Sequence, residues 1–215
     1  MIRARFLSTS PFSHRQERAT TKLAVTYLCP TPYAVKVAFI VGAIRAGFEP
    51  EAFTKQIRAV KLLPHPWGEG VVNTHLVKHW EPPHSDKAKD LLPTHLGSTV
   101  VFREFVYFDG GIDIYLPTEA ADWIVPILPY VNSFGKQGSF FSYLSHEEAK
   151  PPKSTTHIVA SDMTDSATWE KVSNFLGETK KPRDIEAWVS IRAELISGGS
   201  SHKYYRFGEQ TDGNS

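Results

Sequence analysis

Cysteine is nearly absent from this sequence of 215 residues, in which Cys29 stands alone. A single thiol cannot form an internal disulfide, a pattern that fits a reducing cytoplasm. The sequence also lacks any run of about 18 apolar residues that could span a membrane. Its N-terminus carries Arg3 and Arg5 but no apolar stretch like that of a signal peptide. We therefore expect a cytoplasmic protein without a membrane partner.

A metal site is also not expected, although five of the nine histidines gather in one segment: His65, His75, His79, His84 and His95. His75 and His79 are four residues apart, a spacing that suits a metal when the residues lie on a helix. Their neighbours favour strand or loop instead, and no cysteine or carboxylate cluster accompanies them. The sequence predicts no metal ion and no cofactor.

The net charge of +1 conceals an uneven distribution. Residues 1–61 hold ten Lys and Arg against three acids, whereas the rest of the chain holds fourteen against twenty. A cationic half is typical of a protein that meets a polyanion. A plain alternative is that the two halves compensate each other in the folded state.

Periodicity and turn residues predict the strands and helices given at the end of this paragraph. In outline, the first part of the chain reads as a strand, a helix, two strands, a helix and a strand. Thr31 and Pro32 are a good cap and first position for the first helix, which Gly47 should end. Asp109, Gly110 and Gly111 predict a hairpin turn, and Thr118 should cap the second helix. Strands are predicted at 1–7, 23–28, 57–63, 99–108, 112–116 and 139–144, helices at 32–46 and 118–128, and a helical turn at 50–56.

This order predicts an α+β fold of the ferredoxin-like type (βαββαβ), the architecture of RNA-recognition modules. We expect that domain to cover residues 1–149, with a thumb-like insertion at about 64–98 that is rich in proline and histidine. A β-rich C-terminal region should follow at 150–208, and a disordered tail at 209–215. Within that region we expect strands at 155–160, 185–196 and 203–207, and a helix at 165–176. A helix at 185–196 is an equal alternative to the strand.

A glycine-rich loop precedes the last strand of the predicted ferredoxin-like domain. It comprises Gly135, Lys136, Gln137 and Gly138, and Phe140 and Phe141 follow. Glycines let a backbone approach phosphates closely and expose its N–H groups, so this loop is our first candidate for RNA contact. The other candidates are cations and aromatic residues around the first helix: His14, Arg15, Arg18, Lys22, Tyr27, Tyr33 and Lys36. A plain turn, a solvated loop and core packing of the tyrosines are the alternatives.

Three segments resemble the Cas-five family of the RAMP superfamily. They are Thr20–Gly47, which passes from a polar strand into an apolar helix ending in glycine, Phe102–Leu116, and the loop with its strand, Phe134–Tyr143. The resemblance covers the layout of about residues 1–145. It implies the crRNA 5′-handle-binding subunit of a type I CRISPR effector complex (Cascade), which contacts the backbone and large subunits and uses a β-hairpin thumb near the handle.

The resemblance also leaves a catalytic alternative open. One branch of the family cuts precursor RNA without a metal, using a tyrosine, a lysine and a histidine. Here Lys78 and His79, with Tyr33, would be the candidates for such an endoribonuclease. Adjacent residues in a strand point to opposite faces, which argues against a joint role for Lys78 and His79. A ferredoxin-like domain outside CRISPR systems that binds a ligand or partner is the third alternative.

Overall fold

The computed structural model of this chain describes residues 1–15, 23–81, 97–136, 138–151, 157–159, 189–191, 193–199 and 202–207. Its main sheet has seven strands in the order β5–β1–β4–β3–β9–β8, with the short β2 parallel to β4. These strands are β1 (Ile2–Ser8), β2 (Leu23–Ala24), β3 (Leu63–Glu81), β4 (Gly97–Leu116), β5 (Phe141–Glu148), β8 (Ala193–Gly198) and β9 (His202–Phe207). Strands β6 (His157–Val159) and β7 (Val189–Ile191) form a separate pair.

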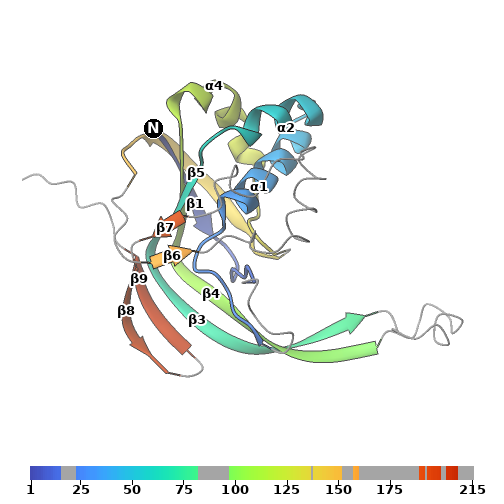
Figure 1. Ribbon diagram of the computed structural model, residues 1–215, viewed down its shortest axis with the longest axis vertical. Helices are drawn as coiled ribbons and strands as arrows, with labels where there is room; N and C mark the ends of the chain where they lie inside the picture. The colour runs from blue at the N-terminus through green and yellow to red at the C-terminus, as the bar shows by residue number, and fades with distance from the viewer. Residues whose placement is uncertain are drawn as a thin grey trace, which may run out of the picture.

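The helices gather at one end of the sheet, while β3 and β4 continue beyond them as a long curved arm (Figure 1). The helices are α1 (Pro32–Arg45), α2 (Pro50–Arg58) and α4 (Ala121–Ile124), joined by the 3₁₀ helices η1 (Thr118–Ala120) and η2 (Val125–Tyr130). Strand β1 pairs antiparallel with β4 and with β5, and β4 pairs antiparallel with β3. In chain order this is the 4-1-3-2 arrangement of a βαββαβ unit, so the predicted ferredoxin-like α+β fold is confirmed.

Helix α1 follows the sequence prediction closely. Its cap Thr31 accepts a hydrogen bond at Oγ1 from the N–H of Ala34 (3.2 Å), and Gly47 follows its end with φ +82°. Val35 and Phe39 are fully buried in the main core. Gly42 packs so closely that a Cβ would lie 2.6 Å from Cγ2 of Val131. The capping residues and the spacing of the apolar residues therefore determine where this helix begins and ends and which face it buries.

The strands around the predicted insertion differ from expectation. Helix α2 extends to Arg58, so the strand predicted at 57–63 is wrong, and β3 begins only at Leu63. The hairpin turn predicted at 109–111 is also wrong, because β4 runs straight through these residues in register with β3. Most of the segment expected as an insertion belongs to the hairpin that β3 and β4 form.

Gly110 and Gly111 allow close packing of neighbouring strands instead of forming a turn. Gly110 lies opposite Gly68 in β3, and Gly111 lies between Trp67 of β3 and Leu7 of β1. A Cβ on Gly111 would be 2.0 Å from the carbonyl oxygen of Phe6, inside the van der Waals contact. Only glycine lets β4 pass between its two neighbours here.

The second helix of the βαββαβ unit is broken into short pieces. Thr118 does not cap it, since the residue before η1 is Pro117 and no side-chain cap bond forms. Pro126 marks the change from α4 to the 3₁₀ helix η2, because proline cannot donate the α-helical backbone bond. The helix predicted at 118–128 is therefore seen as three short helical pieces, η1, α4 and the start of η2.

The C-terminal segment adds to the same sheet. Strand β9 pairs with β3 over Glu69–Asn73, and β8 pairs with β9. Phe207 of β9 is buried beside Tyr27, Cys29 and Phe108. Strands predicted at 155–160, 185–196 and 203–207 are seen in part as β6, β7, β8 and β9, whereas the helix predicted at 165–176 and the tail at 209–215 lie outside the described residues. The domain boundary after residue 149 stays a prediction.

Of the helices in the described part of the chain, none has the length and apolar character needed to cross a membrane.

Buried His65 gives the fold a pH dependence that can be measured. It lies in β3 opposite Asp113, is 6% exposed, and burial lowers its pKa, an effect that a backbone hydrogen bond to Pro66 and the charge of Asp113 only partly offset. Below about pH 6.5 the unfolded chain therefore binds a proton that the folded chain does not. We expect the Tm to fall between about pH 7.5 and 5.5, and the fall to be smaller in His65→Gln.

Thermal unfolding followed by circular dichroism over this pH range measures the effect. His202→Gln is the control, because it makes the same substitution at an exposed histidine. An identical pH slope in His65→Gln and the wild type would contradict this role of His65.

Candidate nucleic-acid interface

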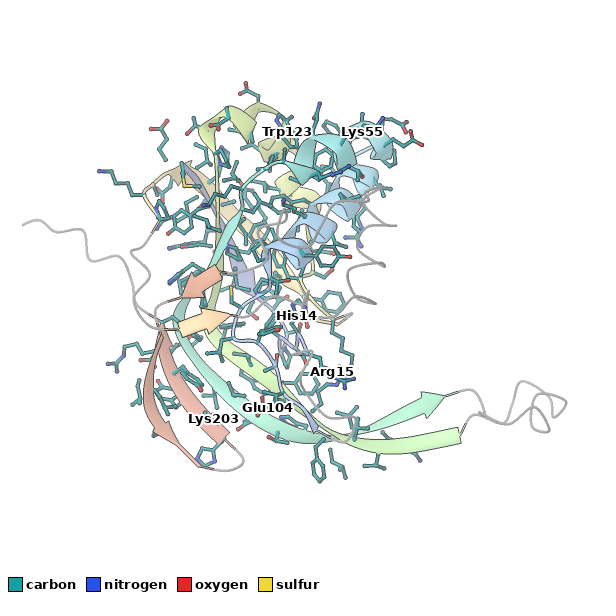
Figure 2. All side chains as sticks on the ribbon, viewed as in Figure 1. His14, Arg15, Lys55, Glu104, Trp123 and Lys203 are labelled. Carbon is teal, nitrogen blue, oxygen red and sulfur yellow. The ribbon has the colours of Figure 1, made fainter. Side chains whose placement is uncertain are left out.

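An open pocket of about 410 Å³ lies where the N-terminal loop, α1, β4 and the glycine-rich loop meet. Its lining residues are His14, Arg15, Tyr33, Ala34, Val37, Arg103, Gly135 and Lys136. Five of these were predicted as RNA contacts from the sequence, and the fold brings them together from three distant segments. None of the described lining residues is acidic. His14 and Arg15 lie side by side in Figure 2, far from Lys55 and Trp123 at the helical end.

Backbone and serine hydrogen bonds connect the N-terminal loop to the glycine-rich loop. The N–H of Lys136 donates to the carbonyl of Ser13 (3.1 Å), and the N–H of Ser13 donates to Oγ of Ser139 (3.1 Å). Oγ of Ser10 donates to the carbonyl of Gly138 (2.7 Å). The two loops form one hydrogen-bonded unit, and this unit places Lys136 beside His14 and Arg15.

Gly135 is required at the centre of this unit. Its φ is +75°, and a Cβ there would lie 3.1 Å from the ring of Phe12 and 3.2 Å from the carbonyl oxygen of Ser13. The expectation that this loop offers its N–H groups to phosphates needs a correction at Lys136, whose N–H is already donated to Ser13. The loop therefore contributes Gly135 and Lys136 to the lining of the pocket, with Lys136 as its charged residue.

Partial burial and repulsion between neighbouring cations both act on the charged side chains of the pocket. Burial lowers the pKa of Lys136, and the nearby charge of Arg103 lowers it further. Burial also lowers the pKa of Arg103, with a further contribution from Arg15. An anion placed among these three side chains would raise the pKa of Lys136 and of Arg103 and so oppose both shifts. The N-terminal turn of α1, which carries Tyr33 and Ala34, adds the positive end of a helix dipole.

Arg103 is a pocket residue that the sequence analysis missed. It lies in β4 opposite Ala24 of β2 and His75 of β3, and its buried Nε has no hydrogen-bond partner in the described part of the chain. Its neighbour Glu104 projects to the opposite face of β4 and is not among the lining residues, and its Oε2 accepts a hydrogen bond from the N–H of Thr26 (3.0 Å). A single arginine in a strand has no sequence feature that marks it as a binding residue. Arg103 is recognised only because the fold brings β4 beside the N-terminal loop.

Two predicted RNA contacts are corrected by their burial. Lys36 is only 6% exposed, and its Nζ donates to the carbonyl of Arg58 (2.7 Å), where it caps the end of α2. Tyr27 is 5% exposed and packs with Cys29 and Phe207 in a small core cluster. Neither side chain faces the pocket, and both serve the fold.

The remaining predicted contacts have different positions. Gly138 is exposed with φ +97° and follows Lys136 in the loop without lining the pocket. Arg18, Lys22 and Gln137 lie outside the described residues.

The catalytic set suggested by the family resemblance is not assembled around the pocket. Tyr33 lines the pocket, but Lys78 is exposed in β3 opposite Val100 and is not among the lining residues. His79 follows Lys78 in the same strand, and its side chain lies outside the described structure. Among the described residues, no group of three or more His, Cys, Asp or Glu side chains is placed to hold a metal ion.

Comparison with known proteins adds the following. No protein-family model matches the sequence, and no curated protein matches it significantly. The fold is similar to that of a CRISPR protein from Archaeoglobus fulgidus. That similarity has 13% identity and a TM-score of 0.41, over 97% of this chain and 93% of the other.

Two cryo-EM structures of the Type III-B Cmr-beta complex also contain a similar chain. With cognate target RNA and AMPPnP bound, that chain is 8% identical with a TM-score of 0.35, over 95% of this chain and 84% of its own length. In the complex with cognate target RNA alone, the similar chain is 9% identical with a TM-score of 0.33, over 95% of this chain and 84% of its own length. All three TM-scores are below 0.5, so the functional argument rests on the geometry of the pocket.

Proposed function

We propose that this protein is an RNA-binding subunit of a CRISPR effector complex. One observation carries the proposal: Arg15, Arg103 and Lys136, with His14, converge on an open pocket whose described lining holds no acidic residue. Cations that repel one another in the free protein are stabilised when a phosphate lies between them. Single-stranded nucleic acid is held by such cation-lined grooves.

The family resemblance supports the CRISPR part of the proposal. Each of the three resembling segments contributes to the pocket: Tyr33 comes from the first, Arg103 from the second, and Gly135 and Lys136 from the third. The finer proposal is a non-catalytic subunit of a type I complex in the cytoplasm. It caps the 5′ handle of crRNA and contacts the backbone and large subunits.

Binding of single-stranded RNA at several salt concentrations tests the proposal. Each neutralised phosphate on a single strand adds about −0.7 to the slope of log K against log salt, so three pocket cations predict a slope of about −2. Fluorescence anisotropy with the repeat RNA measures it, and a scrambled RNA of equal length reports handle specificity. Absence of binding at low salt would overturn the RNA-binding proposal and leave a domain that binds another partner.

Equal affinity for repeat and scrambled RNA would overturn the handle assignment alone. An incubation of the repeat RNA with protein in EDTA, resolved on a gel, tests the non-catalytic role, because discrete cleavage products would contradict it.

A further inference from the structure

Five aromatic and imidazole rings share one face of the β9–β3–β4 part of the sheet. Directly opposite residues of antiparallel strands project to the same face. Between β3 and β4, His75 is opposite Arg103, Asn73 is opposite Phe105, and Val71 is opposite Tyr107. On the other side of β3, Asn73 is opposite His202 and Val71 is opposite Tyr204 of β9. We call His75, Phe105, Tyr107, His202 and Tyr204 the aromatic face.

The rings of the aromatic face are packed against one another at its centre. Nε2 of His75 and the hydroxyl of Tyr107 are joined by a 2.9 Å hydrogen bond. The centroid of the His75 ring lies 5.6 Å from that of Phe105, at an interplanar angle of 78°, and 5.7 Å from that of Tyr107, at 49°. These contacts fix the orientation of the rings while Tyr107 remains 38% exposed and His75 is exposed as well.

The aromatic face is continuous with the cation pocket through Arg103. This arginine lines the pocket and is also the cross-strand neighbour of His75. A strand whose phosphates lie among Arg15, Arg103 and Lys136 therefore has its next bases beside His75 and Tyr107.

We propose that the aromatic face stacks unpaired bases of the RNA strand held in the pocket, an inference that rests on the proposed function. Rings on a sheet surface stack on bases of any sequence, because every base has a π-face. The face suits a nucleobase better than an apolar protein surface, because its exposed members His75, Tyr107 and His202 all carry a polar ring atom or hydroxyl. The exposed aliphatic Leu76 and Val100 lie in the alternate register positions, on the opposite face.

The test uses the full chain and single-stranded RNAs of about 16 nucleotides, each with one 2-aminopurine at a successive position. Stacking on the aromatic face quenches the fluorescence of the base that lies there. In His75→Leu/Tyr107→Leu we expect the quenching to disappear and the affinity to fall about 5- to 100-fold, the range for lost base–aromatic stacking. Tyr107→Phe should retain the quenching, because its ring remains.

Tyr130→Leu is the matched control, since Tyr130 is 48% exposed but lies in η2. It should behave as the wild type. Unchanged quenching and affinity in the double variant would overturn the stacking proposal while the pocket proposal stands. A wild type that binds no RNA would overturn both.

Discussion

Replacing Lys136 with glutamate should weaken binding of single-stranded RNA by about 10- to 100-fold. The estimate follows from the roughly 1.5–3 kcal/mol of a hydrogen bond to a charged group, converted to affinity. The new carboxylate also repels the phosphate beside Arg103. Fluorescence anisotropy measures the loss, and the slope against salt should become shallower by about one contact.

The stability of Lys136→Glu should move in the opposite direction. Burial and the charge of Arg103 both lower the pKa of Lys136, and a glutamate at this position turns the repulsion by Arg103 into attraction. We expect an unchanged or higher Tm together with weaker RNA binding. Lys55→Glu is the control, because it makes the same charge change on exposed α2 away from the pocket (Figure 2). Equal affinity in wild type, Lys55→Glu and Lys136→Glu would remove the loop from the RNA interface.

Replacing Arg5 with leucine should lower the free energy of unfolding by about 3–5 kcal/mol. Both carboxylate oxygens of Asp113 accept hydrogen bonds from Arg5, at 2.9 Å from Nε and 2.9 Å from Nη2. Asp113 is 3% exposed, and the guanidinium of Arg5 also lies 4.6 Å above the ring of Trp67. Among the ion pairs of the described residues, the buried carboxylate then keeps the one with Arg3, whose Nη1 is 3.9 Å away.

Urea unfolding of a double-mutant cycle isolates this pair. Arg5→Leu/Asp113→Leu should recover most of the lost stability, because no unpaired buried charge remains. Arg206→Leu is the surface control, since its partner Glu69 (3.2 Å) is partly exposed, and its loss should be about 1 kcal/mol or less. Losses of equal size in Arg5→Leu and Arg206→Leu would show that burial adds nothing to the Arg5–Asp113 pair.

The parts of the fold that follow local rules were predictable from the sequence. Thr31, Pro32 and Gly47 bound α1 through capping chemistry that needs no tertiary context. The prediction of a hairpin turn at 109–111 was wrong because glycine has two structural roles that cannot be told apart in the sequence. It allows a turn, and it allows a strand to pass close to its neighbours, which is its use at Gly111 beside Phe6.

The candidate site shows the same division. Arg15, Tyr33 and Lys136 were predicted because each lies in a segment with a chemical character of its own. Arg103 was missed, because its value comes from β4 passing beside the N-terminal loop. Lys36 was wrongly predicted as an RNA contact. The sequence of a helix does not show that the ammonium group of its lysine donates to a backbone carbonyl of α2.

The pairing of β9 with β3 sets an order of events for a chain made from its N-terminus. Glu69 and its ion-pair partner Arg206 are separated by 137 positions. At ordinary synthesis rates, β3 therefore waits on the order of ten seconds for its neighbour. During that time its edge presents unpaired backbone groups, and Tyr27, Cys29 and Phe108 lack the cover of Phe207. The nascent protein is then most exposed to pairing with a second copy, and completion of β9 closes that interval.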